Sequence, residues 1–125
     1  MADELYQALG GEAGLRRLVD RFYALMDTLP EAARIRALHQ PDLSSANQKL
    51  YEFLSGWLGG PPLFVEKYGH PRLRARHLPF PIGPAEAAAW MLCMSTALRE
   101  QHPGPLAEHL TVQLGRLAVH MENQP

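Results

Sequence analysis

The chain has 125 residues, of which 12 are Lys or Arg and 13 are Asp or Glu, giving a formal net charge of -1. Its length fits one domain spanning residues 1–125, and its balanced charge argues against a dedicated nucleic-acid binder. The single cysteine, Cys93, excludes an internal disulfide. Met1–Leu5 does not resemble a secretory signal, and no apolar run is long enough to span a membrane. We therefore expect a cytoplasmic protein without a membrane contact.

The first half of the chain predicts helices. Gly10-Gly11 separates a short opening helix from a second one over about 12–28, and a short helical piece follows within 31–40. The second helix is predicted from apolar residues at helical spacing: Leu15, Leu18, Val19, Phe22 and Met26. Asp42 or Ser44 then caps a helix that ends at Gly59-Gly60. The last of these helices carries apolar residues at intervals of three and four: Leu43, Ala46, Leu50, Phe53, Leu54 and Trp57.

The second half predicts two long helices after an irregular segment. In residues 63–82 three prolines confine any helix to about 71–77, although the segment is too apolar for a solvated linker. One long helix begins at Gly83-Pro84, and the last follows Pro103-Gly104-Pro105. No stretch alternates as a strand does, so the pattern predicts an all-α single domain with four substantial helices.

The irregular segment places His77 after a run of arginines, Arg72, Arg74 and Arg76. A neutral imidazole can supply an axial bond to haem iron, and nearby guanidinium groups can neutralise the two propionate carboxylates of haem. A lone histidine beside a loop is more often a surface group, and one or two of the arginines are expected to be simply solvated. No HExxH spacing supports a bare zinc centre.

Four motifs, in order, resemble the group II truncated haemoglobins, which are two-on-two globins. They are Arg21-Phe22-Tyr23, Phe53-Leu54 followed by Gly59-Gly60-Pro61-Pro62, Gly69-His70-Pro71 through His77 to Pro79-Phe80, and Ala89-Trp90 with Cys93-Met94. The resemblance implies a globin-like two-on-two helical sandwich and haem b, iron protoporphyrin IX. It implies His77 as the proximal iron ligand, with Tyr23, His39 and Trp90 on the distal face.

The departures from the family pattern concern the distal side. His39 stands where the family commonly has Tyr or Phe, and Ala46 and Leu50 stand where many globins carry a polar ligand-contacting residue. Arg76 is the best propionate partner, with Lys49 as the second. Trp90 is also expected to contact the haem. Seven further apolar residues are candidate haem contacts, although each is equally acceptable as ordinary core: Phe53, Leu54, Phe64, Phe80, Ile82, Met94 and Leu117.

Trp90 lies in the strongest apolar face, so it is equally typical of a core tryptophan. When buried, however, its indole N–H seeks a partner. A hydrogen bond to a negatively polarised bound ligand contributes about 1.5–3 kcal/mol. Such a bond would slow O2 release about tenfold to a hundredfold.

These residues predict a haem protein that binds O2 and other small ligands, with oxygen-linked redox chemistry such as conversion of NO to nitrate or reduction of peroxide. Whether it is an enzyme stays open. The alternatives are a non-enzymatic oxygen carrier or a gas sensor that works through a partner, and a helical interaction module without a cofactor. The chain has no flavin or nicotinamide domain, so turnover would need an external reductase. A monomer and a homodimer are both compatible with the sequence.

Overall fold

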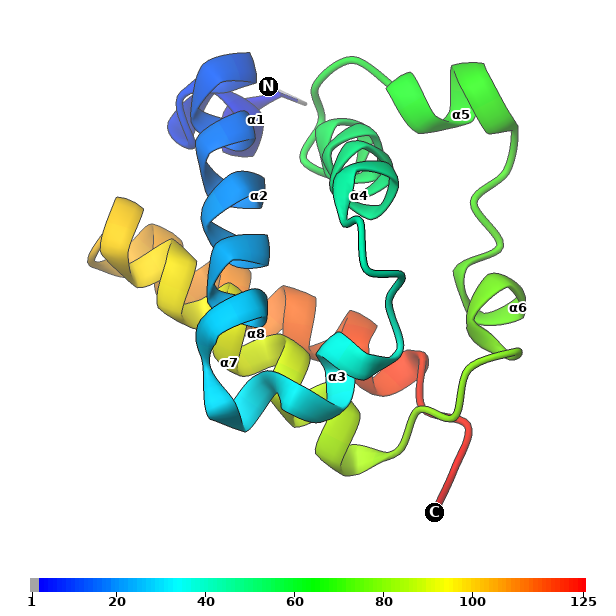
Figure 1. Ribbon diagram of the computed structural model, residues 1–125. Coiled ribbons are helices and arrows are strands. Elements are labelled where there is room, and N and C mark those ends of the chain that lie inside the picture. Colours follow the sequence, from blue (N-terminus) through cyan, green and yellow to red (C-terminus); the bar gives the residue numbers. More distant parts are fainter. Residues whose placement is uncertain (1–2) are drawn as a thin grey trace.

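The structure, a computed structural model, describes residues 3–125 and is helical throughout its regular part (Figure 1). Met1 and Ala2, the start of the segment considered for a secretory signal, lie outside the described residues. The helices are α1 (Glu4–Ala8), α2 (Gly11–Thr28), the 3-10 turn η1 (Pro30–Ala32), α3 (Ala33–Ala37), α4 (Ser44–Trp57), α5 (Leu63–Tyr68), α6 (Leu73–His77), α7 (Pro84–Gln101) and α8 (Pro105–His120).

Two pairs of long helices make the sandwich. α2 packs against α4, α7 packs against α8, and α2 also packs on α7, which joins the two layers (Figure 1). The predicted all-α class and its two-on-two arrangement are confirmed. No helix in residues 3–125 combines the length and the apolar character that crossing a bilayer requires.

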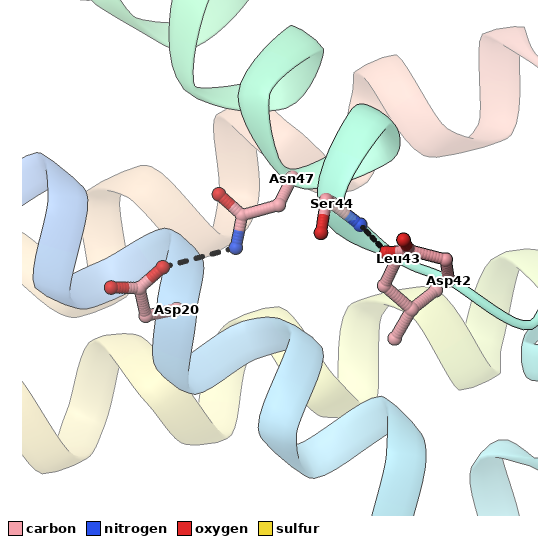
Figure 2. A pocket seen from close by; sticks show the side chains of 5 residues that line it. All are labelled: Asp20, Asp42, Leu43, Ser44 and Asn47. Carbon is pink, nitrogen blue, oxygen red and sulfur yellow. Dashed lines mark hydrogen bonds between the residues drawn. The ribbon is translucent and has the colours of Figure 1, made fainter.

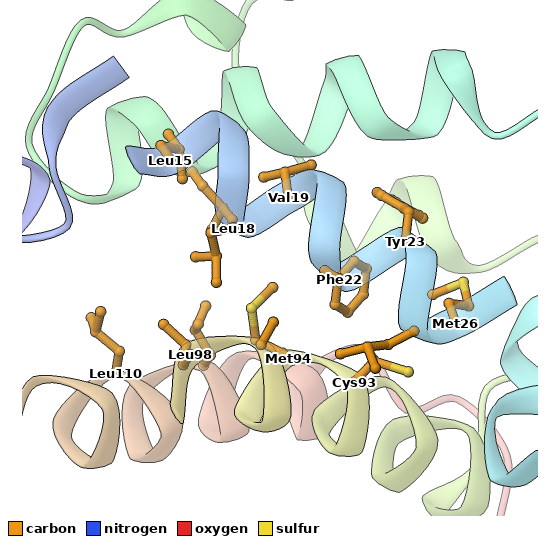
Figure 3. Packing of buried hydrophobic residues seen from close by; sticks show 14 of the residues in the cluster. Leu15, Leu18, Val19, Phe22, Tyr23, Met26, Cys93, Met94, Leu98 and Leu110 are labelled. Carbon is orange, nitrogen blue, oxygen red and sulfur yellow. The ribbon is translucent and has the colours of Figure 1, made fainter. Parts of the chain in front are cut away.

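The core forms where the apolar face of α2 meets α7 (Figure 3). Residues three and four apart share one face of a helix, and the predicted stripe of α2 is completely or almost completely buried. Cys93 is fully buried, as expected for a small apolar side chain. The labelled residues of the core are Leu15, Leu18, Val19, Phe22, Tyr23 and Met26 of α2, Cys93, Met94 and Leu98 of α7, and Leu110 of α8.

The turn after α4 depends on glycine. Gly59 has a φ of 90°, which L side chains rarely adopt. At Gly60 an added Cβ would lie 2.5 Å from the ring of Tyr6, and Tyr6 donates its backbone N–H to the Leu58 carbonyl at 3.2 Å. The predicted stop at Gly59-Gly60 therefore also lets α1 approach the end of α4.

The expectation for residues 63–82 is wrong in one respect. α6 lies within the predicted range 71–77, but α5 (Leu63–Tyr68) is an additional helix. Proline is tolerated just before a first turn, and Pro62 there accepts the Glu66 N–H at 3.0 Å. The helix ends at Gly69, whose φ is 79°. The three prolines of the segment do not lie within residues 63–68, so they do not prevent a helix between Pro62 and Gly69.

The start of α4 differs from the prediction, whereas the start of α7 follows it. The N-cap of α4 is Leu43, which makes no side-chain cap bond, so neither Asp42 nor Ser44 takes that role. Asp42 accepts the Ser44 N–H on its carboxylate at 2.9 Å, and hydrogen bonds from the Ser44 side chain and backbone hold the Asp42 pKa below its usual range. Pro84 opens α7, and the Glu86 carboxylate accepts the Gly83 N–H at 2.8 Å.

Candidate functional site

His77 is the last residue of α6, and its ring has a fixed tautomer. Nδ1 lies 2.6 Å from the Leu73 carbonyl oxygen. A carbonyl oxygen only accepts, so Nδ1 must donate its hydrogen, and Nε2 of the neutral ring keeps its lone pair. The side chain is half-buried. This is the state in which an imidazole binds a metal.

The C-terminal tail holds the segment that follows His77. Asn123 donates its side-chain amide to the carbonyls of His77 at 3.3 Å and Phe80 at 2.9 Å. Its Oδ1 accepts the Ile82 N–H at 3.0 Å, and Arg74 donates to the Glu122 carbonyl at 3.3 Å. Sequence reasoning missed Asn123, because nothing in an isolated asparagine near a chain end signals a contact 46 residues away.

Two of the three polar residues predicted for the distal face, Trp90 and Tyr23, pack on Phe22, and the third, His39, packs on Tyr23. The Phe22 ring centroid is 5.0 Å from that of Trp90 and 4.8 Å from that of Tyr23. The Tyr23 ring in turn meets the His39 ring edge to face, with centroids 5.9 Å apart. Residues from α2, the turn after α3 and α7 thus form one aromatic cluster.

Tyr23 is buried and protonated. Burial raises the pKa of its hydroxyl far above the usual value, and the hydroxyl donates to the Ala46 carbonyl at 3.3 Å. Trp90 is half-buried, and its indole N–H donates to no protein atom within the part of the chain that the structure describes. The cluster therefore contains one donor already engaged and one that is free.

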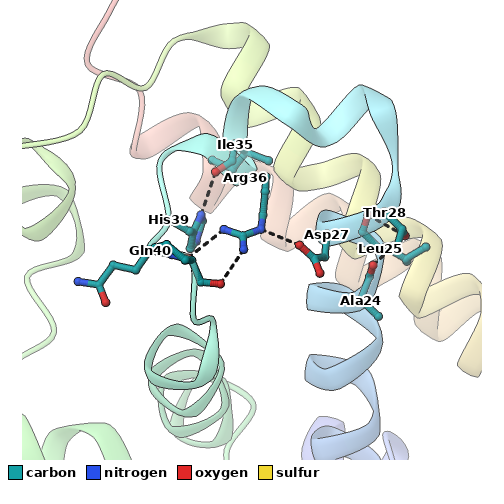
Figure 4. Close-up of polar contacts among 9 residues, drawn as sticks. Ala24, Leu25, Asp27, Thr28, Ile35, Arg36, His39 and Gln40 are labelled. Atoms are coloured by element: carbon teal, nitrogen blue, oxygen red, sulfur yellow. Dashed lines mark hydrogen bonds and ion pairs between the residues drawn. The ribbon is translucent and has the colours of Figure 1, made fainter.

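His39 is anchored in the same way as His77. Its Nδ1 donates to the Ile35 carbonyl at 2.8 Å (Figure 4). Burial lowers the pKa of His39, and positive charge on Arg36 and His77 lowers it further. Since charge on His77 acts on His39, the two imidazoles lie within electrostatic range of each other. At neutral pH, His39 is an uncharged ring with a free Nε2.

Arg36 fixes the backbone that carries His39, a role that the sequence did not reveal. Its guanidinium donates to Asp27 at 2.9 Å and to the carbonyls of Gln40 and Pro41, each at 2.9 Å (Figure 4). One planar group with five donors can tie three acceptors at once. The ion pair therefore links α2 to the turn between α3 and α4.

The predicted cations lie at one aromatic pair. Phe64 and Tyr68 of α5 pack with centroids 4.7 Å apart. The Arg76 guanidinium lies 5.1 Å from the Phe64 centroid, and the Lys49 ammonium lies 5.9 Å from the Tyr68 centroid. Both cations are exposed. The structure therefore brings α4 and α6 charges to the same edge of the candidate site.

The predicted apolar residues are divided between core and surface. Phe64 is buried and meets Phe53 edge to face at 6.3 Å, whereas Phe80 is 43% exposed and lies outside this aromatic cluster. Ala46 and Leu50 of α4 are half-buried against the core. The remaining predicted contacts, Leu54, Ile82 and Met94, are buried, and Leu117 is half-buried.

A surface hollow elsewhere is lined by Asp20, Asp42, Leu43, Ser44 and Asn47 (Figure 2). Asn47 donates to Asp20 at 3.0 Å, so part of its polar lining is already satisfied. None of the candidate site residues lines it. The hollow is separate from the cluster around His39, Tyr23 and Trp90.

The residues present fit a haem. The set combines a metal-competent imidazole on α6, half-buried apolar side chains on α4, a free hydrogen-bond donor on α7 and two cations at one edge. The imidazole, the apolar side chains and the cations suit a flat, apolar, doubly anionic group that contains a metal, and the free donor suits a ligand of that metal.

Comparison with known proteins agrees with this geometry. A family model described as bacterial-like globin matches residues 4–123. The group 2 truncated hemoglobin YjbI of Bacillus subtilis is 43% identical over 122 residues, covering 95% of this chain and 88% of that protein. The solved group II 2-on-2 hemoglobin from Agrobacterium tumefaciens has a TM-score of 0.93 at 54% identity, covering 97% of this chain and 95% of the other.

A third similar structure, the cold-adapted truncated hemoglobin from Pseudoalteromonas haloplanktis TAC125, has a TM-score of 0.93 at 46% identity, covering 97% of this chain and 98% of that chain. The family match spans almost the entire sequence, and each of these relatives is covered over most of its own length. This chain belongs to the group II truncated haemoglobins, a globin family that binds haem and, through it, small ligands such as O2.

Proposed function

We propose that His77 is the axial ligand that holds the haem iron. The observation that carries this proposal is the 2.6 Å bond from His77 Nδ1 to the Leu73 carbonyl, which leaves Nε2 free for the metal. We propose haem b as the form bound, since c-type attachment requires a CxxCH motif and the only cysteine, Cys93, is fully buried in the core. Residues 1–125 act as one truncated globin domain.

Arg76 and Lys49 bind the two propionates in this proposal. Both are exposed, no ion pair engages either in residues 3–125, and the Phe64–Tyr68 pair between them gives their side chains a common edge. Phe64 and Trp90 supply apolar contact with the macrocycle. Phe80 is proposed as a contact from the turn after α6, where its exposed ring leaves apolar area to be covered.

Haem, when bound, supplies the iron at which O2 and other small molecules bind and a reversible one-electron redox change. Trp90 and Tyr23 then provide hydrogen-bond donors and His39 a neutral imidazole, while Ala46 and Leu50 keep the α4 side apolar. Tyr23 must turn its hydroxyl from the Ala46 carbonyl to reach a ligand, whereas the Trp90 N–H is already available. We therefore assign the main ligand contact to Trp90.

Three polar groups around one ligand are more than storage requires, which favours oxygen-linked redox chemistry. Conversion of NO and O2 to nitrate would consume one electron per turnover, which an external reductase would supply. Reduction of peroxide to water is the second candidate and needs two electrons. We also propose that the protein acts in the cytoplasm, as a monomer or a homodimer.

The alternative is an oxygen carrier or gas sensor read by a partner protein. One similar solved structure, at 42% identity, is a truncated oxygen-avid haemoglobin from Bacillus subtilis, a relative that retains oxygen strongly. Strong retention suits reaction or sensing better than delivery. Measured turnover separates these possibilities.

Haem titration followed by NO mixing tests the proposal. Purified protein should bind one haem per chain with a sharp Soret band. After equilibration with O2, it should convert one equivalent of NO to nitrate within the mixing time of a stopped-flow instrument. Absence of a Soret band after haem addition would overturn the cofactor assignment. Haem binding without nitrate formation or peroxide consumption would leave the carrier or sensor function as the correct one.

A further inference from the structure

Helix α6, which carries His77, has no buried face of its own. It is five residues long, and none of its residues is buried. Most of the stability of a helix in a protein comes from packing of its apolar face, and a helix this short is not stable alone. Apart from contact with haem, the position of α6 must therefore depend on hydrogen bonds and ring contacts from neighbouring segments.

The backbone just before α6 is strained. Arg72, the residue that precedes the helix, has a φ of 45°, in the left-handed region that residues other than glycine rarely adopt. Its N–H donates to Nδ1 of His70 at 3.1 Å, a bond that spans only two residues. A strained conformation persists where the surrounding structure holds it, so attachments at the other end of α6 are needed as well.

The last residues of the chain supply such attachments. We call Glu122, Asn123 and Gln124 the C-terminal strap, which runs beside the segment between α6 and α7 (Figure 1). The backbone N–H groups of Asn123 and Gln124 both donate to the Ile82 carbonyl, at 2.7 Å and 3.0 Å. Arg74 of α6 donates to the Glu122 carbonyl at 3.3 Å. The strap thus bonds both α6 and the segment that follows it.

The side chain of Asn123 uses all of its hydrogen-bonding groups on this segment. Nδ2 donates to the carbonyls of His77 at 3.3 Å and of Phe80 at 2.9 Å, and Oδ1 accepts the Ile82 N–H at 3.0 Å. A primary amide has two donor hydrogens and one acceptor oxygen. Because a carboxylate only accepts and an apolar side chain does neither, the three bonds together require an amide.

His77 is consequently fixed at its ring and at its main chain. Its Nδ1 donates to the Leu73 carbonyl at 2.6 Å, inside α6. Its own carbonyl, which has no partner further along the helix, accepts from the Asn123 amide and from the Phe80 N–H at 3.0 Å. The direction in which Nε2 points therefore depends on one attachment inside the helix and one from the strap.

We propose that Asn123 is a positioning residue for the iron ligand. By holding the main chain of His77, it orients the imidazole toward the haem iron, and this orientation sets the strength of the iron–imidazole bond and the retention of haem. An imidazole that is oriented before the metal binds needs little reorganisation. This inference rests on the proposed function, because it takes His77 as the axial ligand.

Resonance Raman spectroscopy of the ferrous haem-loaded protein without a bound gas tests the inference, because the iron–histidine stretching band reports on that bond itself. Asn123→Asp keeps the size and the acceptor oxygen but replaces the donor that serves two carbonyls. The band should broaden and move to lower frequency. Transfer of haem to an apoglobin acceptor should become about twofold to tenfold faster, the factor that corresponds to one net hydrogen bond.

Gln124→Glu is the matched control. It makes the same change from amide to carboxylate one residue further along, and the exposed Gln124 side chain makes no hydrogen bond among residues 3–125. Both the band and the rate of haem transfer should stay as in the wild type. The backbone bond from Gln124 to Ile82 is present in both proteins, so the comparison isolates the Asn123 side chain.

A second pair of variants tests the strap if Asn123→Asp does not fold. Arg74→Gln removes the bond to the Glu122 carbonyl, whereas Arg72→Gln makes the same change of charge two residues earlier, at an exposed side chain. Arg74→Gln should shift the iron–histidine band in the same direction as Asn123→Asp but by less. Arg72→Gln should leave it unchanged.

Three results would overturn the inference. The first is an unchanged iron–histidine band in Asn123→Asp with only a lower free energy of unfolding, which would make the role of Asn123 purely structural. The second is an equal shift in Asn123→Asp and Gln124→Glu, which would make added charge the cause. The third is an identical band in Arg74→Gln and Arg72→Gln. An iron–histidine band that persists in His77→Ala would instead contradict the proposed function itself.

Discussion

Trp90 packs on Phe22 with ring centroids 5.0 Å apart, yet its indole N–H donates to no protein atom in residues 3–125. An apolar body held in place with a free polar tip is suited to contact a ligand beside the core. The packing on Phe22 fixes the ring plane, so the donor needs little reorganisation when a ligand arrives.

Replacing Trp90 with Phe should therefore speed O2 dissociation. Loss of one hydrogen bond of about 1.5–3 kcal/mol corresponds to a tenfold to hundredfold faster off-rate, measured by stopped-flow displacement with CO. Trp57→Phe is the control, since Trp57 lies at the end of α4 and is not among the proposed ligand contacts. An unchanged off-rate in the Trp90 variant would mean that the indole does not touch the ligand.

Replacing His77 with Ala should abolish tight haem retention, or leave an iron that accepts added imidazole. The expected readout is the Soret spectrum and the rate of haem transfer to an apoglobin acceptor. His70→Ala serves as the control because His70 lies in the same segment and is exposed, and among residues 3–125 its ring accepts a hydrogen bond only from the Arg72 N–H, on Nδ1. Equal haem retention in the two variants would contradict the assignment of His77.

His39 should make stability depend on pH. Burial lowers its pKa in the folded protein below the ordinary value of 6.5, so below that pH the unfolded chain binds a proton that the folded one does not. The unfolded state then holds more protons, and the free energy of unfolding rises with pH through this window. Urea unfolding of the haem-free protein from pH 5 to pH 8 should show a slope that is smaller in His39→Phe. An identical slope in both proteins would exclude His39 as the cause.

Most of this fold follows from the sequence, because its determinants are local. The apolar spacing of α2, the proline at the start of α7 and the glycines after α4 each act within a few residues, and each was predicted. The assignment of Tyr23, His39 and Trp90 to a distal face came only from the resemblance to a known family, and it stays a proposal. No periodicity joins residues on α2, on α7 and in the turn after α3.

The features that were missed depend on contacts between residues far apart in the sequence, or on a proline position that a helix tolerates. Asn123 reaches His77 and Phe80 across more than forty residues, and Arg36 bonds three groups of which two are backbone carbonyls. The amino-acid composition and the local sequence indicate neither the Asn123 contacts nor the Arg36 contacts. The helix α5 was missed because proline was taken only as a breaker, although Pro62 precedes the first turn.

Two glycines inside helices should respond oppositely to alanine. At Gly14 of α2 an added Cβ would collide with the backbone carbonyl of Leu9, which also accepts a hydrogen bond from His102 at 3.1 Å. Neither group can move freely, so Gly14→Ala should destabilise the fold by about 1–3 kcal/mol through overpacking.

At Gly115 of α8 the nearest group to an added Cβ is the flexible end of Met91, 4.0 Å away. Gly115→Ala should stabilise the protein by about 0.4–1 kcal/mol, because alanine reduces the freedom of the unfolded chain. Urea midpoints measured at one haem occupancy test both variants. Similar destabilisation by both would show that helix α8 packs more closely at Gly115 than described, and stabilisation by Gly14→Ala would show that α1 and α2 separate easily.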